Sequence, residues 1–123
     1  MSKYKNKIVE VDGIKFHSKL EARYYQQLKW AKEGKTLKDF QLQPKFILQD
    51  KFEKNGKKIR AITYSADFLV TDNEGNQSVI DIKGSPKMTE AFKLKYKMFE
   101  AKFPHTLTIL HYKEGKGWYE GKV

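Results

Sequence analysis

The chain has 123 residues, of which 39% are hydrophobic and 14% aromatic. This length and composition suit one modest hydrophobic core, and the chain is too short for two, so we expect a single domain over residues 1–123. Its formal net charge of +10 attracts polyanions, which makes nucleic acid the expected partner, with a merely solubilising basic surface as the alternative. The absence of cysteine excludes disulfides and thiolate metal sites, and the lack of a signal peptide or membrane-length apolar run predicts a cytoplasmic protein with no membrane association.

The first half of the chain reads as a hairpin, a helix and irregular strands. Residues 7–16 alternate around an Asp12-Gly13 turn signal, which favours a short hairpin. Residues 18–35 place apolar side chains at helical spacing and reach a stop at Gly34. Residues 37–52 alternate again, but Pro44 interrupts them, so we expect one irregular strand leading into a second.

A long hairpin is predicted next. Asn55-Gly56 marks a tight turn before a strand over residues 57–72, which the polar link 72–76 joins to a strand over 77–84. Strict alternation in the first strand predicts one shared face, and the intervening side chains, Asp67 among them, take the other. The members of the first face are Tyr64, Ala66, Phe68 and Val70.

The second half closes with a helix and one or two strands. Residues 85–104 carry an aromatic stripe at helical spacing and end at Pro104, with Ser85 or Thr89 as the cap. Residues 106–113 have strand composition, and the tail after Gly115 can add a last strand. The order of elements predicts an α/β or α+β domain, in which helices flank one central mixed sheet.

Acidic and basic residues inside the predicted hairpin indicate chemistry. Asp81 and Lys83 fall on one face of their strand, and a turn near Glu74 would set Asp67 opposite Asp81. Facing carboxylates repel unless a cation intervenes, and Mg²⁺ binds such carboxylates together with phosphate oxygens. Lys83 would then position a water or stabilise charge on a phosphate.

Simpler structural roles are open for each of these residues. Asp67 and Asp81 can lie at strand ends and point to solvent, although apolar runs surround both. Lys83 can form an ordinary salt bridge with either of them. Glu21, on the first helix, is a third candidate ligand, but Ser18-x-x-Glu21 is also a capping box, and the spacing fits both roles equally.

The residues together resemble a known superfamily. An acid on a first helix, Asp on one strand and acid-x-Lys on the next are similar to the PD-(D/E)XK nucleases. The stretches "VDGIKFHSKLEARYYQQLK", "KKIRAITYSADFLV" and "VIDIKG" look like a family of small phage and prophage proteins of unknown function placed in that superfamily. The likeness covers nearly the whole chain, although Ala66 stands where the name-giving proline would be.

The resemblance implies a restriction-endonuclease-like core and assigns roles to residues. Glu21, Asp67 and Asp81 would be metal ligands, with Mg²⁺ as cofactor and Mn²⁺ as a substitute, and Lys83 would complete the catalytic set. The resemblance also makes basic residues around the second helix candidates for binding nucleic acid, with a solvated surface as the alternative for each: Lys87, Lys93 and Lys97.

The function expected on this basis is metal-dependent cleavage of DNA. Relatedness to Holliday-junction resolvases favours a branched substrate, a homodimer, and a role in phage recombination or packaging inside a bacterial host. Three alternatives are open: a nuclease for flaps, nicks, single strands or a specific sequence; a non-catalytic DNA-binding accessory protein on the same fold; and an RNA-binding protein whose acids form surface salt bridges.

Overall fold

The computed structural model describes residues 8–123, so Lys7 of the predicted hairpin lies outside the described part. In that part a five-stranded sheet runs in the order β11 (Gly117–Glu120), β10 (Thr106–Lys113), β9 (Gln77–Ile82), β8 (Phe68–Thr71) and β3 (Asp39–Leu42). Strands β9 and β10 are parallel and the other neighbours antiparallel, so the sheet is mixed, as predicted.

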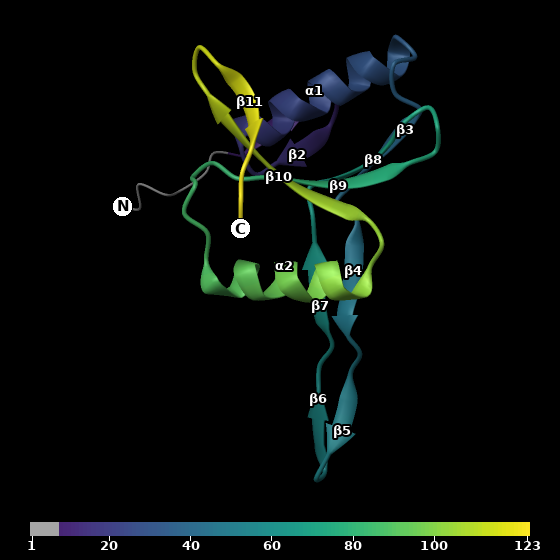
Figure 1. The fold of residues 1–123 in the computed structure, drawn as a ribbon, viewed down its shortest axis with the longest axis vertical. Helices are drawn as coiled ribbons and strands as arrows, with labels where there is room; N and C mark the ends of the chain where they lie inside the picture. The colour runs from purple at the N-terminus through teal and green to yellow at the C-terminus, as the bar shows by residue number, and fades with distance from the viewer. Residues whose placement is uncertain (1–7) are drawn as a thin grey trace.

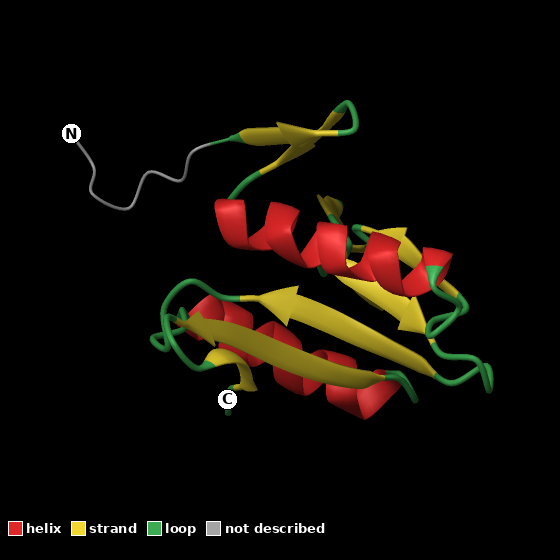
Figure 2. Ribbon diagram, turned by 90° about the horizontal axis from the view of Figure 1, so that it is seen from above, coloured by secondary structure: helices red, strands yellow, loops and turns green. Residues whose placement is uncertain are grey.

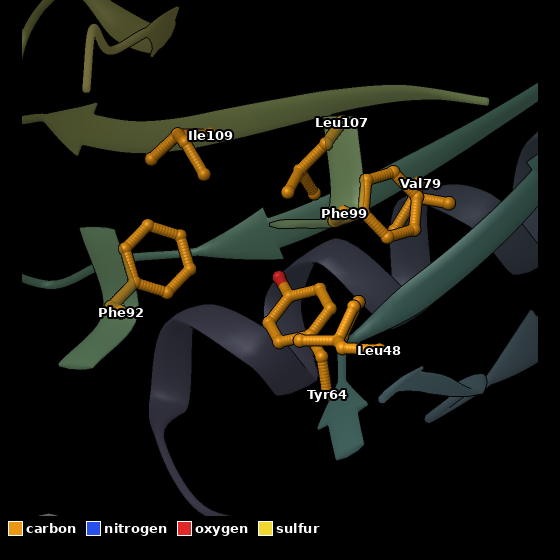
Figure 3. Packing of buried hydrophobic residues seen from close by; sticks show 8 residues of the cluster. Leu48, Tyr64, Val79, Phe92, Phe99, Leu107 and Ile109 are labelled. Atoms are coloured by element: carbon orange, nitrogen blue, oxygen red, sulfur yellow. The ribbon is translucent and has the colours of Figure 1, made fainter. Parts of the chain in front are cut away.

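Helix α1 (Lys19–Glu33) covers one face of this sheet and α2 (Glu90–Lys102) the other, as Figures 1 and 2 show. The α2 side holds a core cluster in which Phe99 and Val79 are fully buried (Figure 3). The α1 side holds a second cluster around Phe68 and Tyr25. Helices on both faces of a mixed sheet confirm the predicted α+β class, and no helix within residues 8–123 is long and apolar enough to cross a membrane.

Local signals located the first hairpin and both helices, although α2 begins five residues later than the predicted start at residue 85. The hairpin of β1 (Val9–Val11) and β2 (Ile14–Phe16) turns at Asp12 and Gly13, both with positive φ, and packs beside α1. Ser18 caps α1, and Thr89 rather than Ser85 caps α2. The tail adds β11, as expected.

The predicted strand over 57–72 is wrong as one element. It divides into β6 (Lys57–Ile59), β7 (Ile62–Ser65) and β8, while the preceding segment supplies β4 (Lys45–Gln49) and β5 (Phe52–Lys54). Strand β4 pairs with β7 and β5 with β6, outside the central sheet.

The division arises where two bends meet. Gln43 takes a positive φ before Pro44, and its N–H donates to the carbonyl of Asp67 at 2.9 Å. In return the Ala66 N–H donates to the carbonyl of Pro44 at 3.1 Å. These two bonds hold the chain at a corner where β3 and β8 stay in the sheet and β4 and β7 leave it.

The corner also overturns the predicted shared face. Tyr64 and Ala66 belong to the core cluster beneath α2, whereas Phe68 belongs to the cluster beneath α1. Alternation requires a continuous strand, and the non-strand residues Ala66 and Asp67 break it, so the side chains after the corner point to the opposite face.

Candidate active site

Asp67 and Asp81 meet at the end of the β8–β9 hairpin. The ladder ends with Phe68 opposite Ile80, and just beyond it the side chains of Asp67 and Asp81 lie within hydrogen-bonding contact of each other. The Asp67 N–H still donates to Ile80 at 3.1 Å, and its carboxylate accepts from the Ile82 N–H at 2.7 Å. The predicted juxtaposition of the two acids is therefore confirmed.

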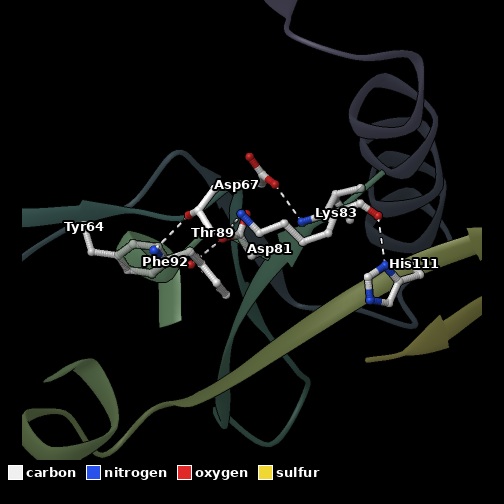
Figure 4. Close-up of polar contacts among 8 residues, drawn as sticks. Tyr64, Asp67, Asp81, Lys83, Thr89, Phe92 and His111 are labelled. Carbon is white, nitrogen blue, oxygen red and sulfur yellow. Dashed lines mark hydrogen bonds and ion pairs between the residues drawn. The ribbon is translucent and has the colours of Figure 1, made fainter. Parts of the chain in front are cut away.

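Asp81 is buried, with 6% of its surface exposed, and one of its oxygens is bound by Tyr64 and Lys83. The Tyr64 hydroxyl donates to Asp81 Oδ2 at 2.6 Å, and Lys83 Nζ forms an ion pair with the same oxygen at 3.6 Å (Figure 4). Burial and the negative charge of Asp81 raise the pKa of the Tyr64 hydroxyl far above its usual range, so the hydroxyl stays a donor. Charge-assisted bonds of this kind fix the carboxylate in place.

Burial and the closeness of the two carboxyl groups make it unfavourable for Asp67 and Asp81 to be ionised at the same time. Burial raises the pKa of the Asp67 carboxyl to about 9, helped by its hydrogen bond with Asp81 and by the negative charges of Asp81 and Glu21, while the Ile82 N–H acts in the opposite direction. In the protein alone the pair therefore holds a proton at neutral pH. A divalent cation between the carboxylates would take the place of that proton, so this donor set fits a hard, oxygen-binding cation.

Lys83 is held from both ends. Its backbone N–H donates to Leu110 at 2.9 Å, and its carbonyl accepts from His111 Nδ1 at 3.0 Å. Its ammonium lies 3.9 Å from the centre of the Phe92 ring, a cation–π contact. Residues on β10 thus hold the Lys83 backbone, and Phe92 on α2 holds its ammonium beside Asp81.

Sequence reasoning assigned no role to His111 and did not single out Tyr64 for its hydroxyl. A signal for His111 was present, because it follows the buried Leu107 and Ile109 at a spacing of two and is itself 4% exposed. An inward-facing histidine on such a strand needs a polar partner. The partner, the carbonyl of Lys83, is 28 residues away in the sequence.

Glu21 lies at the start of α1 and serves as a cap. Its N–H donates to Ser18 Oγ at 3.1 Å, and its carboxylate accepts from the His17 N–H at 3.0 Å. The capping role predicted for Ser18-x-x-Glu21 is therefore confirmed. Glu21 also contributes charge to the Asp67 environment, so it borders the site without joining the acid pair.

These residues surround an open cleft of about 400 Å³ between α1 and α2, lined by Glu21, Tyr64, Ser65, Asp67, Asp81, Ile82, Lys83, Thr89, Ala91, Phe92 and Lys95. All four predicted catalytic residues line it. Within residues 8–123, however, no three acidic or histidine side chains come together in a group that could hold a metal ion. The carboxylate of Glu21 is turned to His17 instead.

The lysines predicted to bind nucleic acid are not among the residues that line this cleft. Lys93 and Lys97 line a separate hollow with Glu90, and Lys93 forms a 3.5 Å ion pair with Glu90. Lys87 is exposed on the loop before α2. Lys95, which the prediction did not select, is the α2 lysine that lines the acidic cleft.

Comparisons with known proteins give a family for this chain but no activity. The model of the family described as "Protein of unknown function (DUF1064)" matches residues 1–116. The chain belongs to this family. The DUF1064 description names no activity, and no curated protein and no solved structure matches the chain. Its relationship to the PD-(D/E)XK nucleases therefore stays a prediction.

Proposed function

We propose that this DUF1064 protein is a metal-dependent DNA endonuclease of the PD-(D/E)XK type that hydrolyses phosphodiester bonds. The observation that supports it best is the Asp67–Asp81 pair, which holds a surplus proton beside Lys83 at an open cleft. Buried like charges are costly, so a scaffold without chemistry would gain stability by losing one of them. The net charge of +10 brings a polyanionic substrate to the same molecule.

Mg²⁺ is the cofactor that these residues suit, with Mn²⁺ as a substitute. Asp67 and Asp81 would hold the ion, and Glu21 would be a third ligand once its carboxylate leaves the His17 N–H. When bound, the ion would lower the pKa of a water and neutralise charge on the phosphate.

The chain's own residues prepare the site for hydrolysis. Tyr64 keeps one Asp81 oxygen fixed at the wall of the cleft. Lys83 orients the attacking water and stabilises the negative charge that grows on the phosphate as the bond to the leaving oxygen breaks. Lys95 and the N-terminus of α2 border the cleft and would contact neighbouring phosphates.

We propose branched DNA as the substrate, in phage recombination or packaging. This step depends on the resemblance to small Holliday-junction resolvases and on the short chain, which leaves little room for a separate recognition domain. Resolution needs paired cuts on opposing strands, so the working unit would be a homodimer with two sites.

Cleavage assays with matched DNA substrates test the activity. The protein is incubated with labelled four-way junction, flap, nicked duplex and linear duplex in Mg²⁺, Mn²⁺ or EDTA. We expect metal-dependent cleavage, strongest on the junction. Asp81→Asn should reduce it by a factor of about 100 or more, since losing one charged group from such a site typically costs a few kcal/mol, while junction binding in EDTA persists.

Glu114→Gln, an exposed acid in the β10–β11 turn, removes the same charge away from the cleft and should leave cleavage unchanged. Activity that survives Asp81→Asn would refute the assigned site. Tight junction binding without cleavage in any metal would favour the non-catalytic accessory protein instead. Preference for a flap or nick would change the substrate alone.

A further inference from the structure

A two-stranded ribbon of residues 45–65 leaves the body of the protein beside α2, as Figure 1 shows. Its base, β4 and β7, is anchored because Phe46 and Leu48 pack with α2 and Lys102 Nζ donates to the Ile47 carbonyl at 2.9 Å. After a bulge near Ile47 the register continues unchanged into β5 and β6. Every residue from 49 to 60 is exposed.

The outer half of the ribbon has two chemically different faces. On one face Glu53 lies opposite Lys58, a complementary pair. On the other face Lys54 lies directly opposite Lys57, next to the apolar pair of Phe52 and Ile59, which are 43% and 38% exposed. We call this second face the tip face.

The tip face is unfavourable for the isolated protein. Like charges directly opposite each other destabilise a ladder, and a two-stranded hairpin without a covering layer is marginal at best. Residues 50–60 carry five basic and two acidic side chains, so the excess charge is not local to one pair. A polyanion that contacts the tip face would relieve the repulsion between Lys54 and Lys57.

We propose that the tip face is a binding surface for duplex DNA, reached by the same molecule that occupies the acidic cleft. The major groove admits a two-stranded β-ribbon, lysines on such a ribbon reach phosphates, and exposed apolar side chains contact sugars and thymine methyl groups. A second copy of this chain is the weaker candidate for this face, because two tips of the same positive charge repel each other.

The ribbon sets where on the DNA this contact falls. Asn55 at the tip lies twelve positions before Asp67 at the site. At about 3.3 Å per strand residue the tip lies on the order of 35–40 Å from the acids, close to the length of one helical turn of DNA, about 34–36 Å. The tip therefore contacts the duplex about one turn from the cleaved bond, an assignment that rests on the proposed function.

Binding to four-way junctions in EDTA separates this contact from cleavage. One junction has branches shorter than a helical turn, about 8 base pairs, and the other has branches of about 25 base pairs. The double variant Lys54→Gln/Lys57→Gln should bind the long junction about 10-fold more weakly and lower its salt slope by about 1.8, as expected for two lost phosphate contacts. Binding to the short junction should change less than about twofold.

The matched control is Lys113→Gln/Lys116→Gln, two exposed lysines in the β10–β11 turn that remove the same charge. It should leave both affinities within about twofold, measured in the same salt. Equal losses in the two variants, no dependence on branch length, or no junction binding by the natural chain would overturn the proposal. The proposal would also be overturned if the ribbon variant kept its DNA affinity but changed its oligomeric state, measured by sedimentation. That result would assign the tip face to contact with a second copy of the chain.

The readout does not depend on catalysis. Binding is measured in EDTA, where metal-dependent cleavage does not proceed, so a failed cleavage assay leaves this measurement intact. If the ribbon variant cleaves the short junction at the normal rate but the long junction more slowly, the result supports both the ribbon assignment and the proposed function.

Discussion

At the scale of single residues, the pairing of Asp67 with Asp81 dominates the site. Asp67 uses one oxygen to accept from the Ile82 N–H, which is where a backbone carbonyl would stand if β8 continued. The acid therefore has a structural role in addition to the chemical role that we propose for it. An asparagine can perform the first and not the second, because its amide oxygen accepts the same bond but it carries no charge.

The raised pKa of Asp67 predicts a pH dependence of stability in the absence of divalent cations. Between the ordinary carboxyl pKa of 3.8 and about 9, the folded protein holds a proton that the unfolded chain has released. The free energy of unfolding should therefore fall as pH rises through this window. Urea denaturation in EDTA at pH 5.5 and 8.5 should show a fall larger than in Asp67→Asn by at least ~1.4 kcal/mol, the equivalent of one pKa unit.

Glu74→Gln, an exposed acid in the turn of the same hairpin, is the control and should keep the pH dependence of the natural chain. Mg²⁺ added at pH 8.5 should restore stability to the natural chain, since the cation replaces the proton. An identical pH dependence in Asp67→Asn and the natural chain would contradict the assigned proton.

At the scale of elements, hydrogen bonds among three residues fix the start of α1. Ser18 accepts from the Glu21 N–H, and the Glu21 carboxylate accepts from His17, so the helix begins at a fixed position beside the cleft. Capping and metal binding were the two roles open to Glu21 on its spacing, and the proposed function needs both at different moments.

Two substitutions separate these roles. Glu21→Gln keeps an acceptor for the His17 N–H, so stability should change by less than ~0.5 kcal/mol, whereas Mg²⁺-dependent cleavage should fall about 10-fold or more, ~1.4 kcal/mol, for a lost ligand. Ser18→Ala should show the reverse: a loss of roughly 0.5–2 kcal/mol in stability with cleavage retained below the unfolding transition. Full activity in Glu21→Gln would leave Glu21 as a cap alone.

The site also depends on the corner between β7 and β8. Paired bends at Gln43–Pro44 and Ala66–Asp67 send one ribbon out of the sheet and leave Asp67 at its edge. Buried Ala66, 2% exposed, stands where the superfamily pattern has proline. A small side chain at that position fits the core cluster beneath α2, and the hydrogen bonds to the Gln43–Pro44 bend hold the corner.

At the scale of the whole molecule, the proposed function needs two active sites in one complex. The cleft opens between the two helices and the ribbon extends from the same corner, so on the proposed function one chain would provide one site and one contact with a duplex. Paired incision of a junction then requires a second chain related by two-fold symmetry.

Mixing experiments test this pairing. On a plasmid whose inverted repeat extrudes a four-way junction, the natural chain should produce mostly linear product. An equal mixture with Asp81→Asn should accumulate nicked circles, since about half of randomly paired dimers hold one active and one inactive site. A mixture that lowers the rate without increasing nicked product would show that chains act independently.

The sequence by itself determined what depends on neighbouring residues. Positive-φ turns at Asp12-Gly13 and Asn55-Gly56, the caps of both helices and the β8–β9 register around residues 72–76 all follow from short-range chemistry. This register runs to the pair of Phe68 with Ile80 and so brings the next residues, Asp67 and Asp81, close together. The period of two puts Lys83 on the same face as Asp81, so half of the site could be predicted from the hairpin.

Only the tertiary structure decided which distant groups complete the site. The Tyr64 hydroxyl, the His111 ring and Lys95 reach it because of strand order, the corner at Ala66 and the rotation of α2, none of which has a local signal. The same corner turned a predicted single strand into a sheet strand and an exposed ribbon. Backbone hydrogen bonds between residues more than twenty positions apart, Gln43 with Asp67 and Ala66 with Pro44, make that choice, and no window of sequence contains both partners.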